Sequence, residues 1–287
     1  MKLATVVIEG KEKAGVIEGE LFYPLESVRE QMEGIPTDLN TLIEHSSEWL
    51  SDLAKLNLTG MEGLAVESLQ YVSPIKPNKN IFCIGKNYAA HAREFDGTPP
   101  ENMIVFTKAP TTVIGHGQPI PLHEGVTNEL DYEGELAVVI GKKGKAISRD
   151  EAEDYIFGYT ILNDITARDL QARHQQFFLG KSLDGTCPLG PWIVTKDEAG
   201  DARDLEIETK VNGEVRQHAR TSLFLFPIDE IIATLPKGMT LEPGDIIATG
   251  TPAGVGKGFK PPRYLKDGDV IEICVESIGT LVNKVQS

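Results

Sequence analysis

The sequence has few cysteines, few basic residues and no long hydrophobic run. Its 287 residues include three cysteines, Cys83, Cys187 and Cys274, which are far apart and form no CxxC pair. This usage favours neither a disulfide framework nor a thiolate metal motif. No stretch reaches the roughly 18 consecutive apolar residues of a membrane span, and the charged N-terminus is unlike a secretory signal. These absences predict a cytoplasmic protein with no membrane partner.

Positive charge is also scarce. The chain has 43 acidic and 28 basic residues, which gives a formal net charge of −15 at pH 7. A polyanion of this kind is repelled by the phosphates of nucleic acid and by anionic membranes, so neither is expected as a partner. A small anionic substrate would meet the same repulsion, and its site would need local cations or a metal ion.

The first part of the chain, residues 1–74, is predicted to form a small α/β domain. The segment 73–78, Ser-Pro-Ile-Lys-Pro-Asn, suits neither a helix nor a central strand, and it marks the domain boundary. Before it, apolar and β-branched runs predict a hairpin, and helical spacing of apolar residues predicts two helices. These elements cover residues 3–9 and 15–23, and residues 38–44 and 46–56.

Residues 75–287 are predicted to be mostly β-structure with a few helices. The continuous apolar run 136–140 is typical of a strand that is buried on both faces, and 155–162 resembles it. Asn212-Gly213 between two β-rich segments is a strong hairpin signal. The fold class expected for the whole chain is therefore α+β, mostly β.

Three acidic residues have a spacing that suits a metal site. Glu133 and Glu135 lie two apart at the start of the buried run, so a strand directs both to one face. A solvated strand end is the usual fate of such a pair. Asp164 follows the next strand, and it is free because Thr166 is better placed to cap the following helix. Three carboxylates without cysteine or histidine favour Mg²⁺ or Mn²⁺ over Zn²⁺.

A candidate base lies in the segment Asn-Tyr-Ala-Ala-His-Ala-Arg-Glu. His91 and Glu94 are three residues apart, so a helical turn places them on one face within hydrogen-bonding reach. A carboxylate that orients an imidazole makes a general base for water. A single HxxE is weak on its own, and a solvated histidine is the alternative. Residues 95–102 are rich in glycine and proline and could serve as a lid.

The glycine-rich segment 250–258 superficially suggests a phosphate loop. The GxxxxGK[ST] pattern fails, because Thr251 stands where glycine is required and Gly258 where a hydroxyl residue is required. Its backbone N–H groups and the Thr251 hydroxyl could still bind a carboxylate. Lys181, in a Gly-Lys-Ser segment, offers a cation, although an ordinary surface lysine is the default reading.

Together and in this order, these segments resemble the fumarylacetoacetate hydrolase superfamily over about residues 75–287. The motifs that carry the resemblance are GKNYAAH (85–91), DYEGE (131–135), NDITARDLQ (163–171), GKS (180–182) and TGTPAGVG (249–256). The resemblance implies a mixed β-roll catalytic domain with a small N-terminal domain, usually as a homodimer. It further implies Glu133, Glu135 and Asp164 as metal ligands, His91 and Glu94 as the base dyad, Lys181 as a contact to the metal-bound substrate, and Thr251 and Gln171 as substrate-binding residues. Arg168 also matches and is given a structural role.

The resemblance leaves the reaction open. The namesake branch has an extra acidic ligand before the histidine, where this chain has Lys86-Asn87, so the chain looks closer to the smaller acylpyruvate hydrolases and oxaloacetate decarboxylases. The leading expectation is metal-dependent C–C hydrolysis of an acylpyruvate-like 2-oxo acid through a metal-bound enolate. Oxaloacetate decarboxylation is the first alternative, and isomerisation of a hydroxymuconate-type diacid the second. A non-enzymatic binding protein is least expected, because triad, dyad and carboxylate loop are all present.

Overall fold

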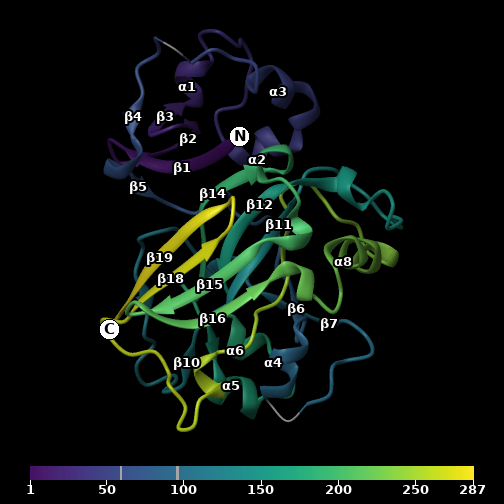
Figure 1. Cartoon of the computed structure of the whole chain (residues 1–287). Helices are drawn as coiled ribbons and strands as arrows, with labels where there is room; N and C mark the ends of the chain where they lie inside the picture. Colours follow the sequence, from purple (N-terminus) through teal and green to yellow (C-terminus); the bar gives the residue numbers. More distant parts are fainter. Residues whose placement is uncertain (59, 95–96) are drawn as a thin grey trace.

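The computed structural model describes residues 1–58, 60–94 and 97–287 and shows a mostly β protein with short helices (Figure 1). The strands are β1 (Lys2–Ile8), β2 (Lys11–Glu18), β3 (Leu21–Pro24), β4 (Leu64–Ala65), β5 (Gln70–Tyr71), β6 (Ile81–Gly85), β7 (Ile104–Lys108), β8 (Val113–Ile114), β9 (Ile120–Pro121), β10 (Leu130–Asp131), β11 (Gly134–Ile140), β12 (Ile156–Asn163), β13 (Thr166–Ala167), β14 (Cys187–Thr195), β15 (Glu206–Val211), β16 (Glu214–Arg220), β17 (Ile246–Ala248), β18 (Val270–Val275) and β19 (Gly279–Gln286). The α-helices are α1 (Leu25–Val28), α2 (Leu39–Glu44), α3 (Ser46–Leu53), α4 (Ala89–Glu94), α5 (Arg168–Arg173), α6 (Phe178–Lys181), α7 (Lys196–Ala199) and α8 (Ile228–Thr234).

The elements expected in the N-terminal region are present with one correction. β1 and β2 form the expected hairpin, and α2 and α3 lie where helical spacing predicts them. The stretch 15–23, expected as one strand, is instead divided between β2 and β3. The chain reverses at Gly19-Glu20, and Gly19 takes a φ of +59°, which glycine adopts without steric cost. The polar residues of this turn interrupt the apolar run.

The main sheet crosses the boundary expected near residue 74. Among the described residues it has 12 strands, in the order β4-β3-β2-β1-β14-β12-β11-β17-β6-β7, with β5 and β8 paired at its sides. Lys2 and Leu3 of β1 pair with Val194 and Ile193 of β14, so the N-terminal lobe at the top of Figure 1 is hydrogen-bonded to the larger part. The division into residues 1–74 and 75–287 stays a prediction.

The centre of the main sheet is buried on both faces. Every residue of β11 and β12 is buried, as the continuous apolar runs predict. Leu136 and Val138 pack into the cluster that contains Ile207 and Ile273 of the five-stranded sheet β16-β15-β18-β19-β9. Ala137 and Val139 pack with the opposite cluster, which reaches into the N-terminal lobe. The mostly β, α+β fold class is confirmed.

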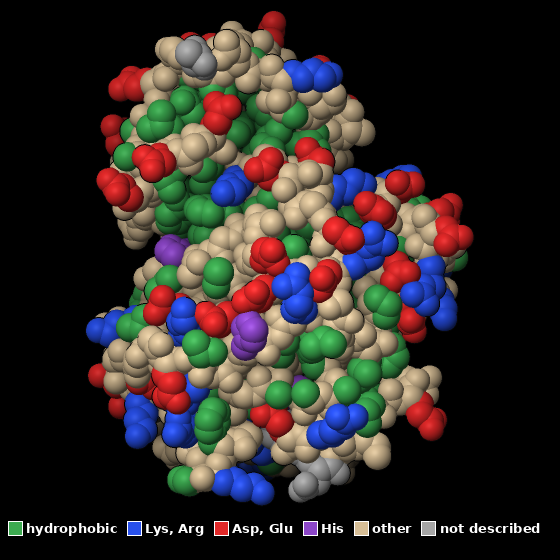
Figure 2. Space-filling view, in the orientation of Figure 1, with side chains coloured by type: hydrophobic (Ala, Val, Ile, Leu, Met, Phe, Trp, Pro, Cys, Tyr) green, Lys and Arg blue, Asp and Glu red, His purple; other side chains and the backbone are tan. Residues whose placement is uncertain are grey.

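The surface carries no single region of one charge on the face shown in Figure 2. Acidic and basic side chains are interspersed there, so on this face the acidic excess is spread rather than gathered. Within the described residues, no helix is long and apolar enough to cross a membrane.

A buried asparagine fixes the segment between β6 and α4. Lys86 takes a φ of +54° immediately after β6, and the chain then enters α4. The amide of Asn87 donates to the carbonyls of Phe226 (3.1 Å) and Thr249 (2.7 Å), and its oxygen accepts from the Phe226 N–H (2.7 Å). One of these bonds ties the start of α4, and hence His91, to Thr249 just after β17, and the other two tie it to Phe226 just before α8.

We expect Asn87→Ala to lower the free energy of unfolding by about 3 kcal/mol, because three buried hydrogen bonds each contribute about 1 kcal/mol. Asn80→Ala, which removes an exposed asparagine just before β6, is the control and should change stability by less than about 0.5 kcal/mol. Urea denaturation of both variants measures the difference. Equal midpoints for the two variants would contradict this account of the turn.

Candidate metal centre and base dyad

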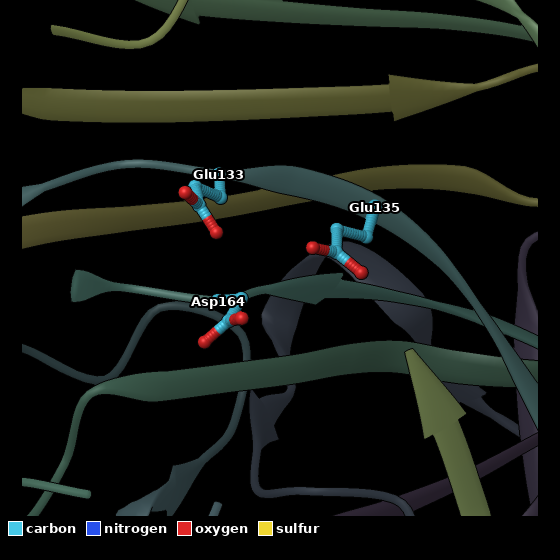
Figure 3. Close-up of side chains that lie close together, drawn as sticks. All are labelled: Glu133, Glu135 and Asp164. Carbon is cyan, nitrogen blue, oxygen red and sulfur yellow. The ribbon is translucent and has the colours of Figure 1, made fainter. Parts of the chain in front are cut away.

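Three carboxylates meet at the ends of two paired strands. Glu133, Glu135 and Asp164 each offer an oxygen, these oxygens lie within 4.8 Å of one another, and Figure 3 shows the three side chains close together. β11 and β12 set this arrangement, because Glu135 pairs with Leu162 and the Asp164 N–H donates to the Glu133 carbonyl at 2.8 Å. All three residues are at most 5% exposed. The expected convergence of these residues is confirmed, and their role as ligands stays a prediction.

Three buried cations compensate part of this negative charge. The Lys181 ammonium lies 2.5 Å from Glu133 Oε2 and 2.6 Å from Asp164 Oδ2. Arg168 contacts the other oxygen of Glu133 at 2.6 Å. Lys108, fully buried, donates to the Ile165 carbonyl and lies 3.0 Å from Asp164 Oδ1. Burial alone would raise the pKa of Glu133, but Lys181 and Arg168 together lower it to about 2.

Glu135 is the triad member with the least compensation. Its Oε2 accepts the Gly250 N–H at 2.7 Å. Burial and the neighbouring charges of Asp164 and Glu133 raise the pKa of this carboxyl well above its ordinary value. A divalent cation between the three carboxylates would remove that cost, so the donor set fits a hard cation. The residues that would hold it are Glu133, Glu135 and Asp164.

Asp164 does not cap a helix, as expected, but the reason differs from the one expected. Thr166 does not cap the following helix: it lies in β13, and its hydroxyl donates to the Asp164 carbonyl at 2.9 Å. The N-terminal cap of α5 is Ala167, which has no side-chain acceptor. Thr166 cannot cap α5 because it is part of strand β13, which pairs with β10.

His91 and Glu94 form the expected pair on α4. His91 Nδ1 lies 2.9 Å from Glu94 Oε2, and His91 is 6% exposed. Glu94 Oε1 accepts the N–H of Gly254 at 2.7 Å, so one carboxylate joins α4 to the glycine-rich loop. The lid expected over 95–102 includes Phe95 and Asp96, which lie outside the described residues, and it stays a prediction.

Glu133, Glu135 and His91 line one cavity of about 260 Å³, and Asp164 lies behind the two glutamates, fully buried. Lys181, Gln171 and Thr251 also line it, so the structure brings together the residues expected to meet substrate. Gln171 Oε1 accepts from Arg168 at 3.1 Å, which leaves the amide N–H groups of Gln171 as donors. Thr251 Oγ1 donates to the Gly134 carbonyl and accepts from Gln217. Its hydroxyl proton is therefore already donated within the protein, and a substrate carboxylate would have to replace that bond to accept it.

Several residues of the site have no distinctive signal in the sequence. Lys108 ends an ordinary apolar strand, and nothing in its neighbourhood distinguishes it from a surface lysine. Asp131 stands beside the expected ligands, but its role as acceptor for Arg168 at 2.8 Å requires the folded chain. Arg168 has the structural role expected of it, because it contacts Asp131, Glu133 and Gln171. Lys86 and Lys257 add two cations to the cavity wall.

The fold and the site define a β-rich protein with a buried centre suited to a hard cation, and comparison with known proteins gives its family. The model described as fumarylacetoacetate (FAA) hydrolase C-terminal matches residues 80–286. Oxaloacetate tautomerase YisK of Bacillus subtilis (strain 168) is 48% identical over 300 residues, covering 99% of this chain and 100% of that protein. The chain belongs to the fumarylacetoacetate hydrolase family.

Solved structures agree over the whole chain. A fumarylacetoacetate hydrolase from psychrophilic Exiguobacterium antarcticum is 44% identical, with a TM-score of 0.89 and coverage of 100% of this chain and 99% of that one. Maleylpyruvate hydrolase from Sphingobium sp. SYK-6, in complex with manganese(II) and pyruvate, is 30% identical, with a TM-score of 0.82 and the same coverage. These similarities include the N-terminal lobe.

We expect Glu135→Gln to stabilise the protein in the presence of a chelator at pH 7. A carboxyl whose pKa is higher in the folded than in the unfolded chain destabilises the fold once the pH exceeds the unfolded value of about 4.3. The gain should be at least about 1.4 kcal/mol, which corresponds to a pKa shift of one unit. Denaturant titrations from pH 4 to pH 7 should show the gain growing with pH.

The exposed Glu62 provides the matched control, since Glu62→Gln removes the same charge without relieving a buried cluster. It should change stability by less than about 0.5 kcal/mol. A Glu135→Gln protein that is no more stable than the wild type at pH 7 would show that the triad is already neutralised in the absence of metal.

Proposed function

We propose that this protein is a divalent-metal-dependent enzyme that moves a proton at the carbon beside the keto group of a small anionic 2-oxo acid. The observation that carries the proposal is one cavity lined by two carboxylates of an oxygen-only triad, Glu133 and Glu135, and by a histidine held by a carboxylate. In this assignment Glu133, Glu135 and Asp164 bind Mg²⁺ or Mn²⁺. A bound cation would supply a Lewis acid that stabilises negative charge on the C2 oxygen and so favours loss of a proton from C3.

The side chains around the triad provide the remaining steps. His91 takes the C3 proton and then gives a proton to the C2 oxygen, which forms the enol, while Glu94 on Nδ1 holds the ring and stabilises its protonated form. Lys181 supplies a positive charge beside the triad, where the C2 oxygen gains charge. The amide N–H groups of Gln171 donate to substrate oxygens, and the loop at Thr251 receives a carboxylate. The cation, Lys86 and Lys257 offset the repulsion that the net charge of −15 imposes on an anionic substrate.

The substrate that these features favour is oxaloacetate, with interconversion of its keto and enol forms as the reaction. The cavity of about 260 Å³ is below the range of about 300–1,000 Å³ that is usual for larger ligands, so a short diacid suits it. The 48% identity with an oxaloacetate tautomerase over the full chain supports the same choice. Tautomerisation needs one group that removes the C3 proton and gives a proton to the C2 oxygen, and the dyad can serve in both steps.

C–C hydrolysis of an acylpyruvate-like acid, the leading expectation from the sequence, is the second candidate. The same dyad can activate water instead of the substrate carbon. The similarity to a maleylpyruvate hydrolase whose structure contains manganese(II) and pyruvate favours this reading. Decarboxylation of oxaloacetate requires the same stabilisation of negative charge on the C2 oxygen but no attacking water. It therefore depends less on His91 as a general base.

A homodimer in the cytoplasm, with neither nucleic acid nor membrane as partner, completes the proposal. The dimer rests on the family resemblance. Light scattering at micromolar concentration should give twice the mass of the chain, and the mass of a single chain would contradict the dimer.

We expect His91→Ala to slow oxaloacetate tautomerisation by about 10²–10⁴-fold, the usual contribution of a general base. The measurement follows the ultraviolet absorbance of the enol in the presence of Mg²⁺ or Mn²⁺, with pyruvate determined in parallel. Tautomerisation changes the enol signal without releasing pyruvate, whereas decarboxylation releases it. Pyruvate release from an acylpyruvate, with no effect on the enol, would select hydrolysis instead.

His218→Ala is the matched control, because His218 also pairs with a glutamate, Glu206, at 2.9 Å but lies on the exposed strand β16. It should leave the rate unchanged. A His91→Ala protein that tautomerises oxaloacetate and hydrolyses acylpyruvates at wild-type rates would make the dyad structural and the proposed mechanism wrong.

A further inference from the structure

The glycine-rich loop 250–258 uses its backbone to bind the protein's own carboxylates. The N–H of Gly250 binds Glu135, and the N–H of Gly254 binds Glu94. Farther along, the N–H groups of Gly256 and Lys257 bind the two oxygens of Asp131, at 2.6 and 3.0 Å. One short loop therefore holds a triad carboxylate, the dyad carboxylate and the carboxylate that anchors Arg168. This explains why the loop resembles a phosphate loop yet lacks its full pattern.

The glycines of this loop are required for different reasons. Gly254 has a φ of +104°, and a Cβ there would lie 1.8 Å from the Arg216 carbonyl, so no other residue fits. Gly258 lies in the short 3₁₀ turn Gly256–Gly258, and its φ is one that other residues adopt. A Cβ on Gly258 would lie 2.6 Å from Oε1 and 3.1 Å from Cδ of Glu94. The requirement for glycine at 258 is therefore set by the space that Glu94 occupies.

We propose that Gly258 is a positioning residue for the base dyad: by lacking a side chain it leaves the one space in which Glu94 can bind the Gly254 N–H and His91 together. The two oxygens of Glu94 divide these tasks, with Oε1 on Gly254 and Oε2 on His91. A methyl group at 258 pushes Oε1 off the loop, and Oε2 moves with it because the carboxylate is rigid. The proposal rests on the proposed function of His91 and Glu94 as the base.

The expected consequence is a loss of rate without a loss of metal or substrate binding. A displacement of about 1 Å of a positioning group can lower a rate by about 10²-fold. Glu135 is held by Gly250, at the other end of the loop, and the three atoms nearest to a Cβ at 258 all belong to Glu94. Gly258→Ala should therefore lower kcat by about 10–100-fold and leave KM and the Mn²⁺ dissociation constant within about twofold of the wild type.

Gly238→Ala is the matched control for adding a methyl group to a glycine. Gly238 has a negative φ and an added Cβ would meet no atom within 4 Å, so kcat, KM and Mn²⁺ affinity should stay unchanged. Calorimetric titration of Mn²⁺ and thermal unfolding of each variant accompany the kinetics. A fall in Mn²⁺ affinity parallel to the fall in kcat would mean that the whole loop is disturbed, and would overturn the assignment.

A double-mutant cycle with Glu94→Asp tests the contact directly. The shorter aspartate withdraws from position 258, so Gly258→Ala should cost less than about threefold in kcat in the Glu94→Asp background. Equal costs in both backgrounds would overturn the proposal, as would wild-type kcat for Gly258→Ala while Glu94→Asp is impaired. Wild-type kcat for both Glu94→Asp and His91→Ala would instead refute the base dyad, and with it the proposed function.

Discussion

The architecture of the site depends on one constraint, the burial of several carboxylates next to one another. One oxygen from each of Glu133, Glu135 and Asp164 lies within 4.8 Å of the others, and all three residues are buried, in a protein that already carries an excess of acidic residues. Like charges at this separation are costly unless cations or hydrogen-bond donors compensate them. The surrounding structure supplies both, from Lys181, Lys108 and Arg168 and from the backbone of the glycine-rich loop.

The two sheets make this arrangement rigid. β11 and β12 are covered on both faces, so the ends that carry the triad cannot move apart without opening the core. The base is placed less directly, on a helix of six residues that Asn87 ties to β17 and that Glu94 ties to the glycine-rich loop. A site that needs its groups held within about 0.5 Å is best built on rigid elements such as strands. A group on a short helix, like His91, needs additional hydrogen bonds that hold the helix in place.

Much of this could be predicted from residues alone. Strand periodicity gave Glu133 and Glu135 a common face, helical spacing paired His91 with Glu94, and order along the chain indicated the family. The prediction that Thr166 caps the following helix was wrong, because Thr166 pairs with Asp131 of β10 and so lies in a strand. Lys108 and Asp131 could not be predicted, because their partners are set by tertiary packing that brings them beside Asp164 and the glycine-rich loop. The function of that loop could not be predicted either, because the carboxylates that it binds come from distant parts of the chain.

The central claim is that the buried triad binds one divalent cation beside the base dyad. Crystals grown with Mn²⁺ test it most directly through the anomalous scattering of manganese. The account predicts one peak per chain, in contact with an oxygen from each of Glu133, Glu135 and Asp164, with the Lys181 ammonium moved away from the triad oxygens. A triad that shows no peak at saturating Mn²⁺, with Lys181 still bridging Glu133 and Asp164, would contradict the account.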